Sequence, residues 1–414
     1  MNVTIRPQKL CGTITPPPSK SQAHRLIIAA ALADGESVLS NVAFSQDILA
    51  TLSCMEQLGA RWEKIDGSTI RVQGLAAGAP VLQKDGMPHF DCGESGSTLR
   101  FLIPIALAVA GGGVFSGRGR LMERPQTPYF DLFEEKGIFW EQKDGTLTVR
   151  GTLESGTFLL PGNVSSQFFT GLLYALPLLD GASRITATTA LESESYIAMT
   201  MDALKGCGVA VDVLEGKQGS FFVPGAQRYA PTQRRVEADW SQAGFWYAAM
   251  ALGNLVDVTG MNENSRQGDQ VVADACVKLC QSGDVELDVA DCPDLVPPLA
   301  AMAAVRKGTA RIVHAARLRI KESDRLSAVT AVMNALGAHI EELHDGLVIC
   351  GVETLCGGVS VDACNDHRIA MMAAVAATRC KEPVTIEGAE CVRKSYPDFW
   401  EDYEMLGGAI TREG

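Results

Sequence analysis

Four apolar stretches of this sequence are each preceded by small hydroxyl residues, glycines or cations. The preceding segments are residues 19–25, 93–100, 165–167 and 365–368. If each apolar stretch is a helix, these segments lie at helix N-termini, where unpaired backbone N–H groups and the positive end of the helix dipole attract anions. Ser, Thr and Asp are also ordinary helix caps, so any single start is compatible with a purely structural role.

The cations in three of these segments favour ligands over simple caps. Lys20 and Arg25 lie in the first segment, Arg100 in the second and Arg368 in the fourth. A cap needs no cation, and the helix dipole opposes a cation at an N-terminus unless an anion lies between them. We therefore predict that these helix starts bind phosphate or carboxylate groups.

Two other segments concentrate charge of both signs. Residues 118–124 hold three arginines, and residues 319–325 alternate cations with carboxylates. If the chain is helical from Lys321 onward, Lys321 and Arg325 lie one turn apart on one face, with Glu322 three residues from Arg325. A solvated helix with internal ion pairs is the alternative interpretation of this segment.

Several common catalytic motifs are missing from the sequence. It contains no G-x-x-x-x-G-K-[ST] nucleotide loop, no G-x-G-x-x-G after a strand and no H-E-x-x-H zinc motif. It also lacks the G-x-S-x-G turn that carries the nucleophile of many hydrolases. These absences argue against the corresponding nucleotide, metalloprotease and hydrolase chemistries.

The composition narrows the partners and the compartment. The chain has 414 residues and a net charge of −13, which argues against nucleic acid or an anionic membrane as partner. No apolar run approaches the roughly 18 residues of a membrane-spanning helix, and the start lacks a secretory stretch, so we expect a cytoplasmic protein. The 12 cysteines are scattered in apolar surroundings and are predicted to be reduced, buried thiols. Cys276 and Cys280 could be two zinc ligands, but no second pair accompanies them.

A recurring signal indicates the architecture. Six times, a helical pattern ends in a glycine and a short apolar strand is expected to follow; the glycines are Gly59, Gly137, Gly208, Gly283, Gly337 and Gly407. The repetition predicts a duplicated α/β unit, with three copies in each half of a two-domain chain. Any α/β protein has several such turns, which is the simpler interpretation. The turn-rich segment 224–232 and the new pattern from Asp239 place a domain boundary near there.

The motifs, taken in order, resemble those of the enolpyruvyl transferase family, and within it the branch that acts on shikimate 3-phosphate. They are Pro-Ser-Lys-Ser at 18–21, Lys-Glu-Ser-Asp-Arg at 321–325, Asn-Asp-His-Arg at 365–368 and Lys-Ser-Tyr-Pro at 394–397. The resemblance implies an α/β fold of two similar domains, each with three βαβαββ repeats (an inside-out α/β barrel), and substrates bound in the cleft between domains.

The same resemblance implies the content of each domain. Residues 19–235 would form one domain, with most contacts to shikimate 3-phosphate. Residues 236–414, together with 1–18, would form the other, with the catalytic carboxylates and the cations that bind phosphoenolpyruvate.

The resemblance further implies a reaction and its participants. The carboxyvinyl group of phosphoenolpyruvate would pass to the 5-hydroxyl of shikimate 3-phosphate, with release of phosphate, by addition and elimination through a tetrahedral intermediate. The reaction would require no metal and no organic cofactor. These two small molecules would be the only partners, and the chain would act as a monomer.

Site residues follow from the resemblance position by position. Lys20, Asp294 and Glu322 would be catalytic, with Asp294 as the base near the hydroxyl and Glu322 exchanging protons with the methylene carbon. Shikimate 3-phosphate would be bound by Lys20, Ser21, Arg25, Ser165, Ser166, Gln167, Ser193, Asp294 and Lys321. Phosphoenolpyruvate would be bound by Lys20, Gly96, Arg124, Gln167, Arg325, His367, Arg368 and Lys394.

Two positions depart from the family's usual pattern. Arg317 stands where the family often has a neutral polar residue that contacts shikimate 3-phosphate. Glu94 and Ser95 stand where some members have Asn-Ala, and Glu94 adds negative charge beside an anion site. We expect Glu94 to point away from the site or to pair with an arginine.

Two rival functions were weighed. The related transferase that acts on UDP-N-acetylglucosamine typically carries a reactive cysteine in the loop before the Arg124 position, and residues 111–124 contain none. A non-catalytic phosphometabolite-binding protein would keep the cationic sites but would not need both Asp294 and Glu322.

Overall fold

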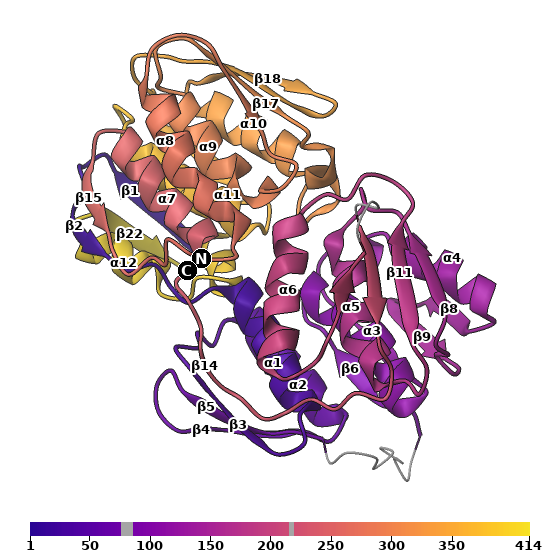
Figure 1. Cartoon of the computed structure of the whole chain (residues 1–414). Helices are drawn as coiled ribbons and strands as arrows, with labels where there is room; N and C mark the ends of the chain where they lie inside the picture. Colours follow the sequence, from indigo (N-terminus) through magenta and orange to yellow (C-terminus); the bar gives the residue numbers. More distant parts are fainter. Residues whose placement is uncertain (76–85, 215–218) are drawn as a thin grey trace. The chain divides into compact units, whose positions relative to one another are not determined.

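The computed structural model describes residues 1–75, 86–214 and 219–414, and these residues form two compact units (Figure 1). The central unit is Lys20–Val236, and the terminal unit joins Met1–Ser19 to Glu237–Gly414. The boundaries expected from the sequence differ from these by one residue at each crossing.

The central unit repeats one β-sheet pattern three times within its described residues. Two sheets follow the chain order βαβαββ. In the first of them, the strands and their connecting helices follow the order β6 (His89–Asp91), α3 (Gly96–Ala110), β7 (Gly112–Ser116), α4 (Thr127–Lys136), β8 (Phe139–Lys143) and β9 (Thr146–Arg150). The second contains β10 (Thr157–Leu160), α5 (Ser166–Ala175), β11 (Ser183–Ala187), α6 (Glu194–Gly206), β12 (Asp212–Val213) and β13 (Ser220–Val223).

The remaining sheet of the central unit borrows its first strand from the end of the unit. It contains α1 (Lys20–Leu32), β3 (Glu36–Ser40), α2 (Gln46–Gln57), β4 (Arg61–Lys64), β5 (Ile70–Gln73) and β14 (Gln233–Arg235). All three sheets begin with one parallel strand pair and continue with two antiparallel pairs. The same order of parallel and antiparallel pairs in all three sheets shows that the βαβαββ pattern is repeated.

The terminal unit contains the same pattern with one shortened copy. A complete sheet follows the order β16 (Val285–Asp288), α9 (Val296–Ala303), β17 (Thr309–Val313), α10 (Arg325–Ala335), β18 (His339–Leu343) and β19 (Gly346–Cys350). A second contains β20 (Val359–Asp362), α11 (His367–Ala377), β21 (Val384–Glu387), α12 (Phe399–Met405), β22 (Ala409–Glu413) and β1 (Asn2–Arg6). In the third, only β2 (Cys11–Ile14) and β15 (Leu255–Val258) pair within the described residues, beside α7 (Trp240–Ala251) and α8 (Val272–Cys280).

The six glycine turns predicted from the sequence are confirmed. All six glycines have positive φ, between 66° and 106°, just beyond a helix. The prediction that apolar strands follow them is wrong. Each following strand lies at the end of its sheet and is largely exposed, as in β8, where four of five residues are exposed. An edge strand has a neighbour on one side only, so its side chains can remain polar and solvated.

The core of each unit lies among its helices. In the terminal unit, α7, α9 and α11 pack against one another, and in the central unit α3 packs against α5 and α1 against α6 (Figure 1). Within residues 1–75, 86–214 and 219–414, none of the helices is both long enough and apolar enough to cross a membrane.

The cysteine prediction is correct for only part of the set. Among the described residues all 12 thiols are free, and seven of them are buried. Four are exposed, contrary to the prediction: Cys11, Cys280, Cys350 and Cys356. Cys11, Cys280 and Cys350 lie at the ends of strands or helices, where fewer neighbouring segments cover a side chain. The described residues contain no group of three or more potential metal ligands around Cys276 and Cys280 or elsewhere.

A glycine sets the spacing between α3 and α5. A Cβ added at Gly171 of α5 would lie 2.5 Å from the carbonyl oxygen of Arg100 and 2.4 Å from the hydroxyl of Tyr129. The first of these atoms belongs to the α3 backbone and cannot swing aside. The absence of a side chain at Gly171 therefore allows the two helices to approach closely, and with them the residues at their N-terminal ends.

We expect Gly171→Ala to lower the free energy of unfolding by about 1–3 kcal/mol, because the new methyl overlaps the α3 backbone. Urea denaturation of the wild type and the variant measures this change. Gly67→Ala is the matched control, because no atom lies within 4 Å of its added Cβ. Equal destabilisation by the two substitutions would contradict the close approach.

Candidate active site

The helix starts predicted from the sequence are confirmed. α1 begins at Lys20, α3 at Gly96, α5 at Ser166 and α11 at His367. Three of the helices have side-chain caps: Ser95 accepts from the Thr98 N–H at 3.1 Å, Ser165 from Gln167 at 3.3 Å and Asp366 from Arg368 at 3.0 Å. Capping and anion binding are therefore compatible here, since each cap occupies only one of the exposed N–H groups.

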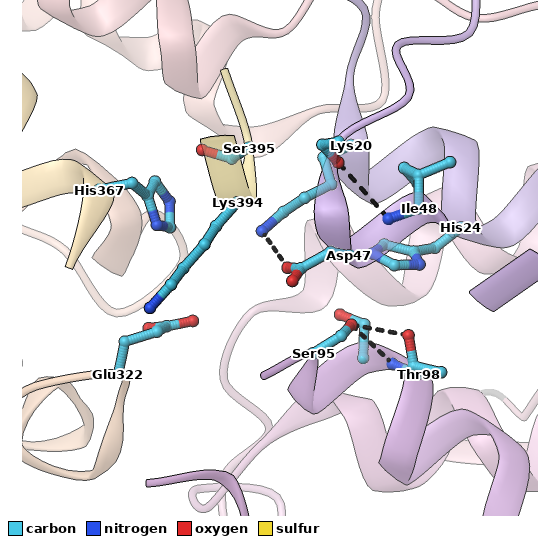
Figure 2. Close-up of polar contacts among 12 residues, drawn as sticks. Lys20, His24, Asp47, Ile48, Ser95, Thr98, Glu322, His367, Lys394 and Ser395 are labelled. Atoms are coloured by element: carbon cyan, nitrogen blue, oxygen red, sulfur yellow. Dashed lines mark hydrogen bonds and ion pairs between the residues drawn. The ribbon is translucent and has the colours of Figure 1, made fainter. Parts of the chain in front are cut away.

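The Lys20 side chain pairs with a carboxylate that the sequence interpretation missed. Its Nζ lies 2.7 Å from Oδ2 of Asp47, in the first turn of α2, and both side chains are mostly buried (Figure 2). This pair modifies the prediction about cations at helix starts, because a protein carboxylate already supplies negative charge beside Lys20. The available signal was a second helix start at Ser45, whose hydroxyl caps α2.

Arg25 is buried without a carboxylate partner among the described residues. Its side chain is 2% exposed, and its guanidinium donates to neutral oxygens only: Ser21 O at 2.8 Å, Tyr196 O at 3.2 Å and Thr200 Oγ1 at 2.9 Å. Burial lowers the pKa of Arg25 to about 10, and the tyrosines nearby offset only part of this effect. A positive charge held in this way is incomplete without an anion.

Two loops bring the predicted serines to the same end of the sheet that contains β10 and β11. The loop before Ser165 and the loop before Ser193 are joined where Thr189 Oγ1 accepts from the N–H groups of Gly162 and Asn163, at 2.9 and 3.2 Å. Ser193 precedes α6 with a φ of 58°, a left-handed conformation that is unusual for a residue with a side chain.

Gly96 and Arg124 are in direct contact. A Cβ at Gly96 would lie 2.6 Å from Nη1 of Arg124, so the guanidinium packs flat against the glycine backbone. The sequence interpretation had assigned this space to a ligand. Arg124 is buried, and its position depends on the missing side chain of Gly96.

Arg100 connects the starts of α3 and α5 and is a further residue that the predicted site set lacks. Its Nη1 donates to Oε1 of Gln167 at 2.8 Å, and its Nη2 donates to the carbonyl of Pro125 at 3.0 Å. Gln167 in turn donates to Oγ of Ser97 at 3.0 Å. Gln167 is thus held from both sides by α3. The signal was present in the sequence, because Arg100 was recognised as a cation after a helix start.

Glu94 lies against the loop that carries the arginines. An added Cβ at Gly119 would meet Oε2 of Glu94 at 2.7 Å, between Arg118 and Arg120 in sequence. The backbone N–H of Arg118 donates to the carbonyl of Gly93 at 2.6 Å, which joins the two loops. The extra negative charge of Glu94 is therefore placed beside the arginine loop.

In the terminal unit, Arg325 is surrounded by three carboxylates. It lies 2.8 Å from Asp294 Oδ1, 2.6 Å from Glu322 Oε2 and 2.7 Å from Asp366 Oδ2. Burial alone would lower the pKa of Arg325, but Asp366, Glu322 and Asp294 more than offset this effect, so the pKa is raised above its ordinary value. Asp366, fully buried, also accepts from Ser323 at 3.0 Å and is absent from the predicted set.

Asp294 contacts three cations. Besides Arg325, Arg368 Nη2 lies 3.1 Å from its Oδ2 and Lys321 Nζ lies 3.5 Å from its Oδ1. The conditional expectation of a helix from Lys321 onward is wrong, because α10 begins at Arg325 and Lys321 lies in the preceding bend. Asp324 is the N-cap of α10, so the helix begins at Arg325 and does not include Lys321. Lys321 and Arg325 nevertheless meet at the same carboxylate.

The remaining predicted residues of the terminal unit flank the start of α11. Lys394 is buried, and its Nζ donates to the carbonyl of Asn365 at 2.6 Å. His367 is buried beside Asp366, with 3.9 Å between its Nδ1 and Oδ1 of that carboxylate. Arg317 donates to the carbonyl of Ala290, in the loop that leads to Asp294.

The structure thus gathers the predicted residues into two groups. Lys20, Ser21, Arg25, Gly96, Arg124, Ser165, Ser166, Gln167 and Ser193 belong to the central unit. Asp294, Lys321, Glu322, Arg325, His367, Arg368 and Lys394 belong to the terminal unit. Each group contains hydrogen-bond donors and cations, several of them at helix starts, and the second group also contains the clustered carboxylates.

Comparison with solved structures defines the fold. The fold is that of an EPSP synthase structure from Acinetobacter baumannii, with a TM-score of 0.80 and 23% identity over 99% of this chain and 100% of that chain.

Sequence comparison identifies the family. The chain belongs to the EPSP synthase (3-phosphoshikimate 1-carboxyvinyltransferase) family, whose model matches residues 5–403. It is 45% identical to the 3-phosphoshikimate 1-carboxyvinyltransferase of Clostridium acetobutylicum, and 44% identical to that of Clostridium kluyveri. Each comparison covers 99% of this chain and 98% of the relative.

The buried ring of His24 predicts a pH dependence of stability. Burial lowers the pKa of His24 well below its ordinary value, and Lys20 and Arg25 lower it further. The unfolded chain therefore binds this proton more readily than the folded chain. We expect His24 to reduce the free energy of unfolding as the pH falls below about 6.5, by at most about 1.4 kcal/mol per pH unit.

Urea denaturation between pH 7.5 and 5.5 measures the effect. Comparison with His24→Asn, which has no titrating ring, separates it from the carboxylates. Parallel pH dependences of the two proteins would show that His24 is protonated equally in both states.

Proposed function

We propose that this chain transfers the carboxyvinyl group of phosphoenolpyruvate to the 5-hydroxyl of shikimate 3-phosphate and releases phosphate. The observation that carries the proposal is the buried Arg25, which has no carboxylate partner among the described residues and donates to Ser21, Tyr196 and Thr200 of the central unit. A phosphorylated acceptor supplies the missing anion. The similarity to 3-phosphoshikimate 1-carboxyvinyltransferases over nearly the whole chain supports shikimate 3-phosphate as that acceptor.

In this proposal, the central unit binds the acceptor through its helix starts. The proposed contacts of this unit are Lys20, Ser21 and Arg25 in α1, Ser165, Ser166 and Gln167 at the start of α5, and Ser193 before α6. Asp294 and Lys321 of the terminal unit are proposed to join them. Hydroxyl and backbone N–H donors suit a phosphate and a polyhydroxylated ring, because each oxygen needs a donor once water is removed.

The donor is proposed to bind to cations of both units. Lys20, Gly96, Arg124 and Gln167 would contribute from the central unit, and Arg325, His367, Arg368 and Lys394 from the terminal unit. Arginine offers two parallel N–H bonds to a carboxylate or phosphate, which favours a fixed orientation of the small donor.

Donor binding is proposed to release Asp294 for catalysis. Asp294 accepts from both Arg325 and Arg368 in the structure, so its lone pairs are engaged. A carboxylate of phosphoenolpyruvate on those arginines would take over these bonds. Asp294 would then be able to accept the proton of the 5-hydroxyl.

The proposed chemistry alternates one acid and one base. Protonation of the methylene carbon by Glu322 creates cationic character at the adjacent carbon, which the 5-hydroxyl attacks as Asp294 takes its proton. The tetrahedral adduct then loses phosphate and a methyl proton, with the roles reversed. Phosphate is a good leaving group and the cations stabilise its charge, so the proposal includes no metal or organic cofactor. The proposal also includes a cytoplasmic monomer with these two small molecules as its partners.

Phosphate release tests the proposed function. The purified chain should release phosphate when given phosphoenolpyruvate and shikimate 3-phosphate together, and mass spectrometry should detect the enolpyruvyl ether of the acceptor. Each substrate alone should give no release. Turnover with UDP-N-acetylglucosamine instead of shikimate 3-phosphate would overturn the proposed acceptor.

Substitution of the carboxylates tests the proposed proton transfers. We expect Asp294→Asn and Glu322→Gln each to lower kcat by about 10²–10⁴-fold, the usual contribution of a general acid or base. Binding of shikimate 3-phosphate, followed by calorimetry, should largely survive. Asp288→Asn is the control, because this carboxylate is exposed and pairs with His314 at 3.0 Å, outside the proposed site. Near-normal kcat in either variant would remove that residue from the chemistry.

A further inference from the structure

A buried polar chain connects three helix starts of the central unit. Lys20 and His24 lie four residues apart on α1, and Asp47 and Thr51 lie four residues apart on α2, so each pair shares one helix face. The faces meet through two contacts of 2.7 Å, Lys20 Nζ to Asp47 Oδ2 and His24 Nδ1 to Thr51 Oγ1. The α1 and α2 starts are therefore held at two successive turns.

The second contact continues into α3. Thr51 Oγ1 lies 2.7 Å from Thr98 Oγ1. Thr98 donates to Oγ of Ser95 at 2.7 Å (Figure 2). Ser95 Oγ also accepts from the backbone N–H of Thr98 and so caps α3, which begins at the next residue, Gly96. His24, Thr51 and Thr98 are completely buried, and Ser95 is nearly so. Water therefore cannot readily replace a missing member of this chain.

The direction of the hydrogen bonds can be derived along the chain. Each hydroxyl has one proton to donate. Thr98 gives its proton to Ser95, so its 2.7 Å contact with Thr51 requires Thr51 as donor. The carbonyl of Asp47, 3.3 Å from Thr51 Oγ1, is a more distant acceptor for the same proton, and with either acceptor Thr51 has no proton left for His24. Thr51 then accepts from His24, which places the proton of the neutral ring on Nδ1. Nε2 is buried and has no hydrogen-bond partner among the described residues, in agreement with a ring that carries only this one proton.

We infer that His24, Thr51 and Thr98 are positioning residues that set the separation between the Lys20 side chain and the backbone at Gly96. This inference rests on the proposed function, in which both Lys20 and Gly96 belong to the phosphoenolpyruvate site. The acceptor residue Arg25 is held independently, through Tyr196 and Thr200 of α6. Lys20 is also a proposed contact of shikimate 3-phosphate, but the other acceptor contacts lie outside this chain. Loss of the chain should therefore weaken donor binding more than acceptor binding.

Thr51→Val removes the central hydroxyl with little change of shape. We expect it to raise the KM for phosphoenolpyruvate about tenfold, the effect of leaving one buried partner unsatisfied. The affinity for shikimate 3-phosphate, measured directly by calorimetry, should stay within about twofold. Thr51→Ser keeps the hydroxyl and should behave like the wild type. Thr385→Val is the control, because it removes a partly buried hydroxyl that bonds to Thr4 in the terminal unit.

Coupling between His24 and Thr51 gives a second, independent test. His24→Asn keeps an amide N–H near the Nδ1 position and should retain the KM for phosphoenolpyruvate, whereas His24→Leu should raise it. Once Thr51→Val has interrupted the chain, adding His24→Leu should raise the KM little further. If Thr51→Val fails to fold, the comparison of His24→Asn with His24→Leu still applies.

Three results would overturn the inference. They are an unchanged KM for phosphoenolpyruvate in Thr51→Val, an equal loss of affinity for both substrates, and full additivity of the His24→Leu and Thr51→Val effects. Absence of phosphate release by the wild type would instead overturn the proposed function. The two failures are therefore distinguishable.

Discussion

The rest of the structure depends on the burial of arginine side chains in a protein whose net charge is −13. A buried guanidinium needs hydrogen-bond acceptors and a compensating negative charge. Arg325 obtains both from Asp294, Glu322 and Asp366, and its pKa is raised despite burial. Arg25 obtains only neutral acceptors, and burial lowers its pKa to about 10. The same residue type is thus buried in two ways, one internally neutralised and the other not.

Because of this difference, the two units would bind an anion in different ways. An anion that approaches the terminal unit meets cations already bound to carboxylates, so binding there is an exchange of partners. An anion at Arg25 meets a charge with no carboxylate partner among the described residues, so binding there adds a partner. Helix dipoles add a cost in both units, because Lys20 and Arg325 are each the first residue of a helix, where a cation is disfavoured by itself. The nearby carboxylates of Asp47 and Asp366 reduce that cost.

The sequence predicts helix starts and turns better than it predicts which side chains pair with one another. The helix starts and the six glycine turns depend on residues within a few positions of each other, and both predictions are confirmed. The partner of Lys20 lies 27 residues away on another helix, and no local pattern identifies Asp47 among 49 acidic residues. The expected helix from Lys321 was wrong for a related reason. Charge spacing was compatible with a helix, but the Asp324 cap starts the helix at Arg325. The roles of the site residues remain predictions, because they derive from the resemblance.

The positions of the arginine residues depend on steric fit as well as on charge. The Arg124 guanidinium occupies the space that a Cβ at Gly96 would need, and the backbone of Arg100 approaches Gly171 closely. In both places a missing side chain allows a charged residue, or the helix that carries it, to come nearer than any other residue type would permit. Gly96, the first residue of α3, therefore does more than expose a backbone N–H group. It also fixes where the nearest cation can lie, so the charge pattern of the site and the packing of α3 against α5 cannot vary independently.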